Sequence, residues 1–106
     1  MVTGFATSVD RLINQVGHWE QSRWWNHTGR SSGASTRADL VYALVQRLAD
    51  RAADAERRPR RPVPRPTDMA LPDQLRVMAD DLIAATPGDD VLKLAADDVE
   101  SVRRAI

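Results

Sequence analysis

The strongest chemical signal in the chain is a ten-residue Arg/Pro segment, residues 57–66, which reads Arg-Arg-Pro-Arg-Arg-Pro-Val-Pro-Arg-Pro. Guanidinium groups bind carboxylates and phosphates through charge-assisted hydrogen bonds. Prolines favour an extended polyproline II backbone that makes no internal hydrogen bonds. The segment can therefore bind acidic groups of its own chain, a protein partner or a nucleic acid. The candidate partner-binding arginines are Arg58, Arg60, Arg61 and Arg65.

Charge is divided unevenly along the chain, although the formal net charge is zero. Residues 1–66 hold eleven Arg against six Asp and Glu (+5), and residues 67–106 hold three Arg and one Lys against nine Asp and Glu (−5). Opposite charges placed in this way stabilise a compact state, although each exposed ion pair adds only up to ~1 kcal/mol. We therefore expect the Arg/Pro segment to pair with acidic residues of the C-terminal half. The expected partners are Asp80, Asp81, Asp97 and Asp98.

Two intermolecular roles are the alternatives for this segment. Residues 59–62 have the bare P-x-x-P spacing for an aromatic groove, but Glu56 and Pro64 occupy the positions where a flanking Arg is usual. Five Arg in nine residues also resemble a phosphate-contacting arm, yet the nine downstream acids would repel a polyanion, and no RNP motif or zinc knuckle is present. We predict a small non-catalytic interaction or regulatory domain that binds a protein partner or self-associates, with nucleic acid as the alternative partner.

All three tryptophans fall within seven residues, at positions 19, 24 and 25. Side chains of adjacent residues point about 100° apart on a helix, so Trp24 and Trp25 cannot face one core equally. Trp19 and Trp24 fit the apolar stripe and are predicted to be packing anchors. Trp25 is expected to lie outside the core. Because tryptophan is enriched at binding hot spots, Trp25 is also a candidate partner contact.

The other residues that could do chemistry form no catalytic or metal-binding motif. His18 and His27 are nine residues apart, whereas helical zinc motifs place two histidines four apart. The Asp pairs at 80–81, 89–90 and 97–98 are sequence neighbours whose side chains diverge on a helix, while acid–base catalysis needs groups that converge in a pocket. There is no Cys and no glycine-rich phosphate loop. We predict no enzymatic activity, no metal and no cofactor.

Apolar residues recur every three or four positions through most of the chain, which predicts helices. The sequence has no long run of alternating apolar and polar residues and no Asn-Gly or Asp-Gly hairpin dipeptide, so no strand is predicted. The expected fold is all-α, a single domain of residues 1–106 built as a bundle of about four helices. These helices are expected at about 7–25, 36–58, 71–85 and 89–105, with a flexible loop at 26–35 and an extended crossover at 57–66.

Several residues have the chemistry of helix ends. Thr7 or Ser8 is expected to cap the first helix. Thr36 followed by Asp39 predicts an approximate capping box for the second. Pro72 suits the first turn of the third, because its missing N–H would have no partner there.

The two connections around the third helix predict its neighbours. The short turn at 86–88 predicts that the helices at 71–85 and 89–105 form an antiparallel pair. Ten residues in polyproline II conformation span roughly 30 Å, about the length of a 20-residue helix. The crossover is therefore long enough for the helices at 36–58 and 71–85 to run parallel.

The sequence also predicts a cytoplasmic protein without a membrane segment. The longest purely apolar stretch, Leu40–Val45, is far shorter than the ~18 residues of a membrane span. Asp10 interrupts the N-terminal apolar run and no base precedes Arg11, which argues against a signal peptide.

Overall fold

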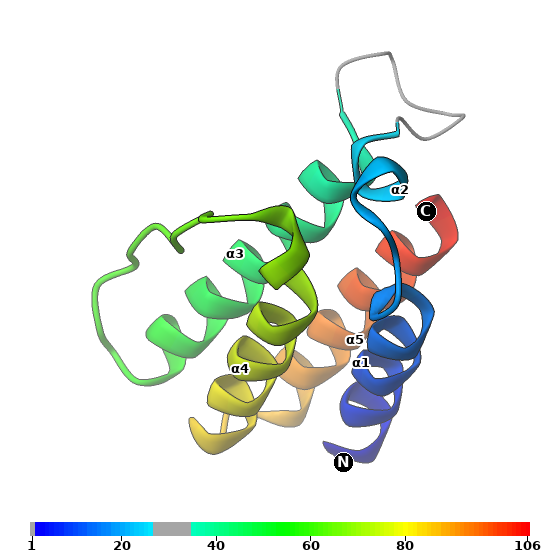
Figure 1. The fold of residues 1–106 in the computed structure, drawn as a ribbon. Helices are drawn as coiled ribbons and strands as arrows, with labels where there is room; N and C mark the ends of the chain where they lie inside the picture. The colour runs from blue at the N-terminus through cyan, green and yellow to red at the C-terminus, as the bar shows by residue number, and fades with distance from the viewer. Residues whose placement is uncertain (1, 27–34) are drawn as a thin grey trace.

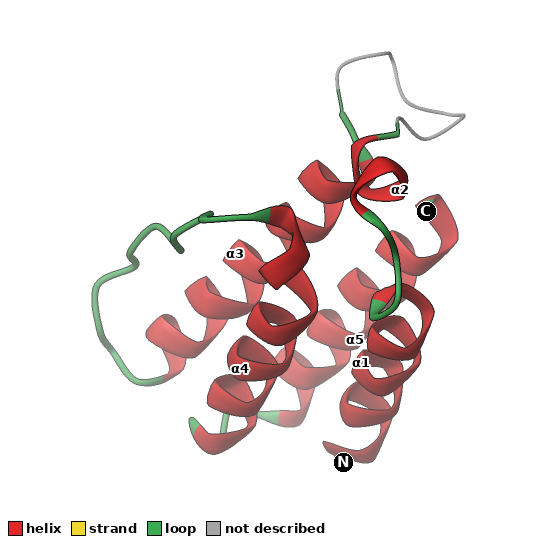
Figure 2. Ribbon diagram, in the orientation of Figure 1, coloured by secondary structure: helices red, strands yellow, loops and turns green. Residues whose placement is uncertain are grey.

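The computed structural model describes residues 2–26 and 35–106, and every regular element in these two ranges is helical (Figures 1 and 2). The all-α prediction is confirmed. The elements are α1 (Val2–Val16), α2 (Gln21–Trp25), α3 (Arg37–Ala55), the short 3₁₀ helix η1 (Asp68–Ala70), α4 (Leu71–Ala84) and α5 (Asp89–Ala105). The loop predicted at 26–35, with His27, lies outside the described residues except for its two end positions.

The four long helices stand around one apolar core (Figure 1). α3 packs most extensively on α4 and α5 on α1, while contacts of α1 with α4 and of α3 with α5 close the ring. The helices α4 and α5 run in opposite directions but lie diagonally across the core from each other. The predicted antiparallel direction is confirmed, but the two helices do not pack extensively on each other as a hairpin, because α4 packs mainly on α3 and α5 mainly on α1.

α3 and α4 run in the same direction, as the length of the crossover allows (Figure 1). Residues 58–65 have no helical or strand structure and return beside α3 to the start of α4. The extended crossover is therefore confirmed, and it replaces the tight loop that an up-down-up-down bundle would use.

The first helix differs most from the prediction. α1 ends at Val16 and a separate short helix, α2, begins at Gln21, so a continuous helix over 7–25 was wrong. Trp19 and Trp24 are five residues apart and would point about 140° apart on one helix. Breaking the helix lets both side chains enter the core, where their rings meet edge to face at 5.0 Å.

Glycine is needed where α1 ends. A Cβ at Gly17 would lie 2.8 Å from the backbone oxygen of Ile13, closer than real side chains come. The helix also begins earlier than predicted, because the aromatic side chain of Phe5 is buried in the core. Thr7 and Ser8 lie inside α1 and do not cap it.

The other helix ends follow the sequence closely. Thr36 and Asp39 form a reciprocal capping box, with both hydrogen bonds at 3.0 Å, and Pro72 lies in the first turn of α4. α3 ends at Ala55, three residues before the predicted end, in a Schellman-type turn closed by hydrogen bonds from Arg57 N–H to Asp54 and from Arg58 N–H to Ala53.

The described core is aliphatic with few aromatic residues. Its largest fully buried side chains are Trp24, Phe5 and six leucines. Over the two described ranges, none of the helices has the length and apolar character needed to cross a bilayer.

Thr86, which follows α4, has a left-handed backbone conformation with φ of 46°. A β-branched residue is strained there, whereas glycine is not. We expect Thr86→Gly to raise the free energy of unfolding by about 1 kcal/mol, measured by urea denaturation. Thr67→Gly is the control, because Thr67 has an extended φ of −154° and its hydroxyl caps η1. A gain in Thr67→Gly equal to that in Thr86→Gly would refute the strain argument.

Candidate functional site

The Arg/Pro segment is fixed to α3 through the side-chain amide of Gln46. This amide accepts a hydrogen bond from the Val63 backbone N–H at 2.8 Å and donates one to the Arg61 carbonyl at 3.0 Å. One glutamine thus pairs with the backbone on both sides of Pro62, as a neighbouring strand would. Val63 itself is buried against the core, which makes it the one buried residue of the segment.

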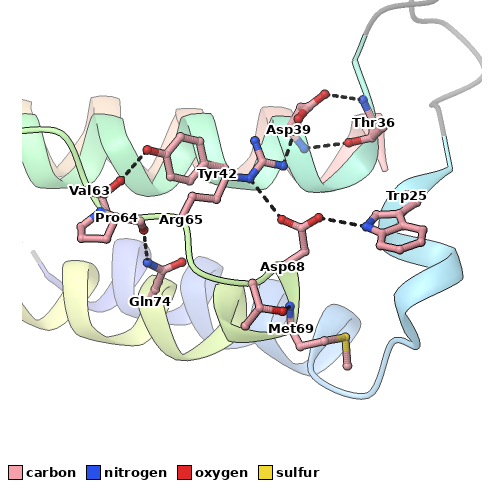
Figure 3. A network of polar contacts seen from close by, with 11 residues as sticks. Trp25, Thr36, Asp39, Tyr42, Val63, Pro64, Arg65, Asp68, Met69 and Gln74 are labelled. Carbon is pink, nitrogen blue, oxygen red and sulfur yellow. Dashed lines mark hydrogen bonds and ion pairs between the residues drawn. The ribbon is translucent and has the colours of Figure 1, made fainter.

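Two further hydrogen bonds hold the C-terminal part of the segment between α3 and α4 (Figure 3). The Tyr42 hydroxyl donates to the Val63 carbonyl at 2.5 Å, and the Gln74 amide donates to the Pro64 carbonyl at 2.7 Å. Tyr42 and Gln46 are one turn apart on α3, while Gln74 comes from α4. The backbone from Arg61 to Pro64 is therefore fixed from both sides.

Arg65 is the centre of a polar network that joins four elements (Figure 3). Its guanidinium contacts Asp39 of α3 at 3.0 Å and Asp68 of η1 at 3.1 Å, and it lies 4.9 Å from the centre of the Tyr42 ring. The second oxygen of Asp68 accepts a hydrogen bond from the Trp25 indole N–H at 3.1 Å. The network thus links α2, η1, the Arg/Pro segment and α3.

The charges in this network stabilise one another. The Thr36 backbone N–H lowers the pKa of Asp39 below its ordinary value of 3.8, and Arg65 lowers it further, against the opposing effect of burial. Burial lowers the pKa of Arg65, but its bonds to Asp39 and Asp68 outweigh this effect and raise it. Both groups of the Asp39–Arg65 pair are therefore charged at neutral pH.

The lowered pKa of Asp39 predicts an acid-sensitive contribution to stability. A carboxylate with a depressed folded-state pKa stabilises the fold above its unfolded pKa, and this is lost as the pH falls through the folded value. Wild type should exceed Asp39→Asn in free energy of unfolding by about 0.5–1 kcal/mol at pH 6, a value reduced because the carboxylate is 40% exposed. The difference should shrink as the pH falls below 3.8 and through the lower folded-state pKa of Asp39. Urea denaturation across this range measures it, and a pH-independent difference would contradict the assignment.

The remaining arginines of the segment do not pair as predicted. Arg58 contacts Glu56, and Arg60 makes two parallel hydrogen bonds to Asp54, of 3.0 and 2.7 Å. The guanidinium groups of Arg57 and Arg61 are exposed and make no ion pair with any described residue. Asp68 is thus the one carboxylate of the acidic half that the segment contacts in the described structure.

Pairing with Asp80, Asp81, Asp97 and Asp98 was therefore a wrong prediction. Asp98 is instead held by Arg51 at 2.9 Å and by Arg47 at 3.8 Å, both from α3. The physical reason is proximity: the last turn of α3 places carboxylates directly beside the beginning of the Arg/Pro segment, whereas α5 lies on another side of α3.

A shallow groove of about 200 Å³ lies between the Arg/Pro segment, α3 and α4. We call it the basic groove. Its floor is apolar, formed by Ala49, Ala52, Ala53, Val63 and Met78. Its edges carry Arg58, Arg61, Asp81 and three prolines, Pro59, Pro62 and Pro64.

The structure therefore divides the five predicted partner-binding residues among three places. Arg58 and Arg61 line the basic groove. Arg65 and Trp25 meet on Asp68 at the other end of the segment, and Arg60 is engaged by Asp54. As predicted, Trp19 and Trp24 are buried while Trp25 is 55% exposed.

The residues that fix the segment, Tyr42 and Gln46, were not found by sequence reasoning. Polar residues on a helix usually indicate a solvated face. Two features of the sequence could have indicated this contact. Tyr42 and Gln46 are four residues apart, beside the apolar stripe of α3, and Val63 is the one apolar residue besides proline in the Arg/Pro segment.

Metal binding finds no geometric support in the described part of the chain, where no three His, Cys, Asp or Glu residues converge. Comparisons with protein families, curated proteins and solved structures found no match.

Proposed function

We propose that the chain is a non-catalytic protein-interaction domain whose docking surface is the basic groove. The observation that carries this proposal is the position of Arg58 and Arg61, which stand exposed at the edge of an apolar floor. Because Gln46 and Tyr42 already fix the backbone beside the groove, binding would order little additional chain. Such preorganisation lowers the entropy loss of association.

The groove indicates the chemistry of its partner. An apolar floor made of alanine, valine and methionine side chains suits one aliphatic side chain of moderate size. Arg61 at the edge makes no ion pair within the described residues and suits a carboxylate beside that side chain, whereas Arg58 is already paired with Glu56. We therefore expect a peptide segment in which an aliphatic residue is flanked by Asp or Glu.

Nucleic acid binding is less well supported by the same geometry. Three of the five arginines, Arg58, Arg60 and Arg65, are engaged by carboxylates of the chain. If only the other two contact phosphate, the slope of log affinity against log salt is about −1.8, rather than about −4.5 for five contacts.

A peptide library displayed on phage and selected on the purified protein tests the proposed function. We expect enrichment of sequences with an aliphatic residue beside acids, and we expect Arg61→Glu to weaken their binding about tenfold. Arg60→Glu is the matched control, because it makes the same charge change on the neighbouring residue, whose side chain does not line the groove.

Two results would refute the proposal. One is a selection that yields no peptide, or only peptides that bind both variants equally. The other is tight oligonucleotide binding with a salt slope near −4.5, which would favour the nucleic acid alternative.

A further inference from the structure

α4 and α5 contain the same nine-residue pattern, which we call the acidic motif. Residues 73–81 read Asp-Gln-Leu-Arg-Val-Met-Ala-Asp-Asp, and residues 90–98 read Asp-Val-Leu-Lys-Leu-Ala-Ala-Asp-Asp. The two copies agree in the first Asp, the Leu, the base, the aliphatic fifth residue, the Ala and the final Asp pair. Their burial also agrees: the leucine is buried in both copies, and the fifth residue, Val77 or Leu94, is 52% exposed in both.

The exposed aliphatic residue of each motif is surrounded by carboxylates. On a helix, residues three and four positions apart are surface neighbours, so Val77 lies among Asp73, Asp80 and Asp81. The same spacing surrounds Leu94 with acids. Trp25 and Met69 are the other two large hydrophobic residues exposed in the described structure, and neither has this arrangement. An apolar side chain with a carboxylate beside it is complementary to the apolar floor and to Arg61 of the basic groove.

One copy of the motif already binds arginines within the molecule. Asp98, the last residue of the α5 copy, is held by Arg47 and Arg51, which are one turn apart on α3. The equivalent residue of the α4 copy is Asp81, and neither it nor Asp80 makes an ion pair within the described residues. In the α4 copy both residues of the final Asp pair are therefore without an ion pair in the described structure, whereas in the α5 copy Asp98 is engaged.

We infer that the occupant of the basic groove is a second copy of this chain, which inserts Val77 of α4 over the apolar floor and places Asp80 beside Arg61. This inference rests on the proposed function and names its partner. Met78 and Asp81 of the same helix line the groove, and Val77 precedes Met78 and lies one helical turn before Asp81. Because the inserted side chain and the groove adjoin, a two-fold dimer forms both contacts at once and closes.

Charge favours a second copy as the partner. The molecule carries no formal net charge, so two copies do not repel each other at long range. Its basic segment and its acidic α4 surface instead attract each other between copies. Because these charges are exposed, salt should weaken the association.

Sedimentation velocity over a concentration series tests the inference at ionic strengths of about 0.01 M and about 1 M, where charges are screened over about 30 and 3 Å. Wild type should form dimers at the lower value and dissociate at the higher one.

Asp80→Arg and Arg61→Glu should each weaken dimerisation about tenfold, because a reversed pair occurs twice in a two-fold dimer. An equimolar mixture of the two variants should recover wild-type affinity. In the mixed dimer, one contact pairs the two reversed charges with each other and the second contact keeps the native pair.

The α5 copy of the motif supplies the matched control. Asp97→Arg makes the same charge change at the same motif position, on an exposed residue of a different helix, and should change the dimer affinity less than twofold. Circular dichroism of every variant should match that of wild type.

Several outcomes would overturn the inference, and they can be distinguished from failure of the proposed function. A wild type that stays monomeric at both ionic strengths excludes the second copy, while Arg61-dependent peptide selection would still support the groove as a docking surface. A dimer lost in Asp97→Arg but kept in Asp80→Arg would contradict the role of α4. Failure of the mixed variants to recover would contradict the pairing of Asp80 with Arg61.

Discussion

Replacing Trp24 with alanine is expected to lower the free energy of unfolding by about 3–5 kcal/mol. The Trp24 side chain is 1% exposed, and its ring meets that of Trp19 at 5.0 Å. Alanine would leave a cavity and remove this aromatic contact, which itself contributes about 0.5–1.5 kcal/mol. Small domains have total stabilities near 5 kcal/mol at the low end, so much of the variant should be unfolded at 25 °C.

Trp25→Ala is the matched control for this substitution. The Trp25 side chain is 55% exposed and donates a hydrogen bond to Asp68, so its loss should remove less than about 1 kcal/mol. Urea denaturation followed by far-ultraviolet circular dichroism compares the two variants. Equal losses of unfolding free energy in the two variants would contradict the assignment of Trp24 to the core and Trp25 to the surface.

Replacing Gln46 with alanine is expected to cost about 2 kcal/mol and to release the Arg/Pro segment. The Gln46 amide is the hydrogen-bonding partner of both the Val63 N–H and the Arg61 carbonyl. Its removal leaves the partly buried Val63 N–H and the exposed Arg61 carbonyl without these bonds, and it removes support from one wall of the basic groove. Peptide binding or dimerisation through the groove should weaken with it.

Hydrogen exchange of the Val63 amide measures this release directly. The amide should be protected in wild type and should exchange much faster in Gln46→Ala. Gln74→Ala is the control, since Gln74 donates one exposed hydrogen bond to the segment, to Pro64, and should cost under about 1 kcal/mol. Unchanged protection of Val63 in Gln46→Ala would show that the burial of its side chain alone fixes the segment.

The helices that could be predicted most closely are those in which periodicity and end signals agree. The helix α5 has two acids in its first turn and two arginines in its last turn, on either side of its apolar stripe. Its observed bounds, Asp89–Ala105, equal the predicted ones. The helix predicted at 7–25 failed because Trp19 and Trp24 were placed on one stripe, although five residues turn a helix by about 140°. Gly17 was the available sign of the break.

The site was less predictable than the fold. The exposure of Trp25 followed from the angle between adjacent helical side chains, and the structure agrees. The ion pairs of the Arg/Pro segment could not be predicted, because the net charge of each half of the sequence does not say which side chains lie close together in the fold. Asp54 lies six residues before Arg60 and binds it, while Asp98 of α5 binds arginines of α3. The groove itself depends on the parallel packing of α3 and α4, and the length of the crossover only permits that packing.

The packing of α1 against α5 has a consequence for how the chain folds. These helices come from opposite ends of the sequence and share one of the most extensive interfaces of the bundle. Contacts between distant parts of a chain slow folding, so we expect slower folding than for a bundle in which sequential helices are neighbours. During synthesis, the part of the α1 apolar stripe that packs on α5 stays uncovered until α5 has left the ribosome. A chaperone that binds exposed apolar helices would therefore meet the N-terminal part of this chain first.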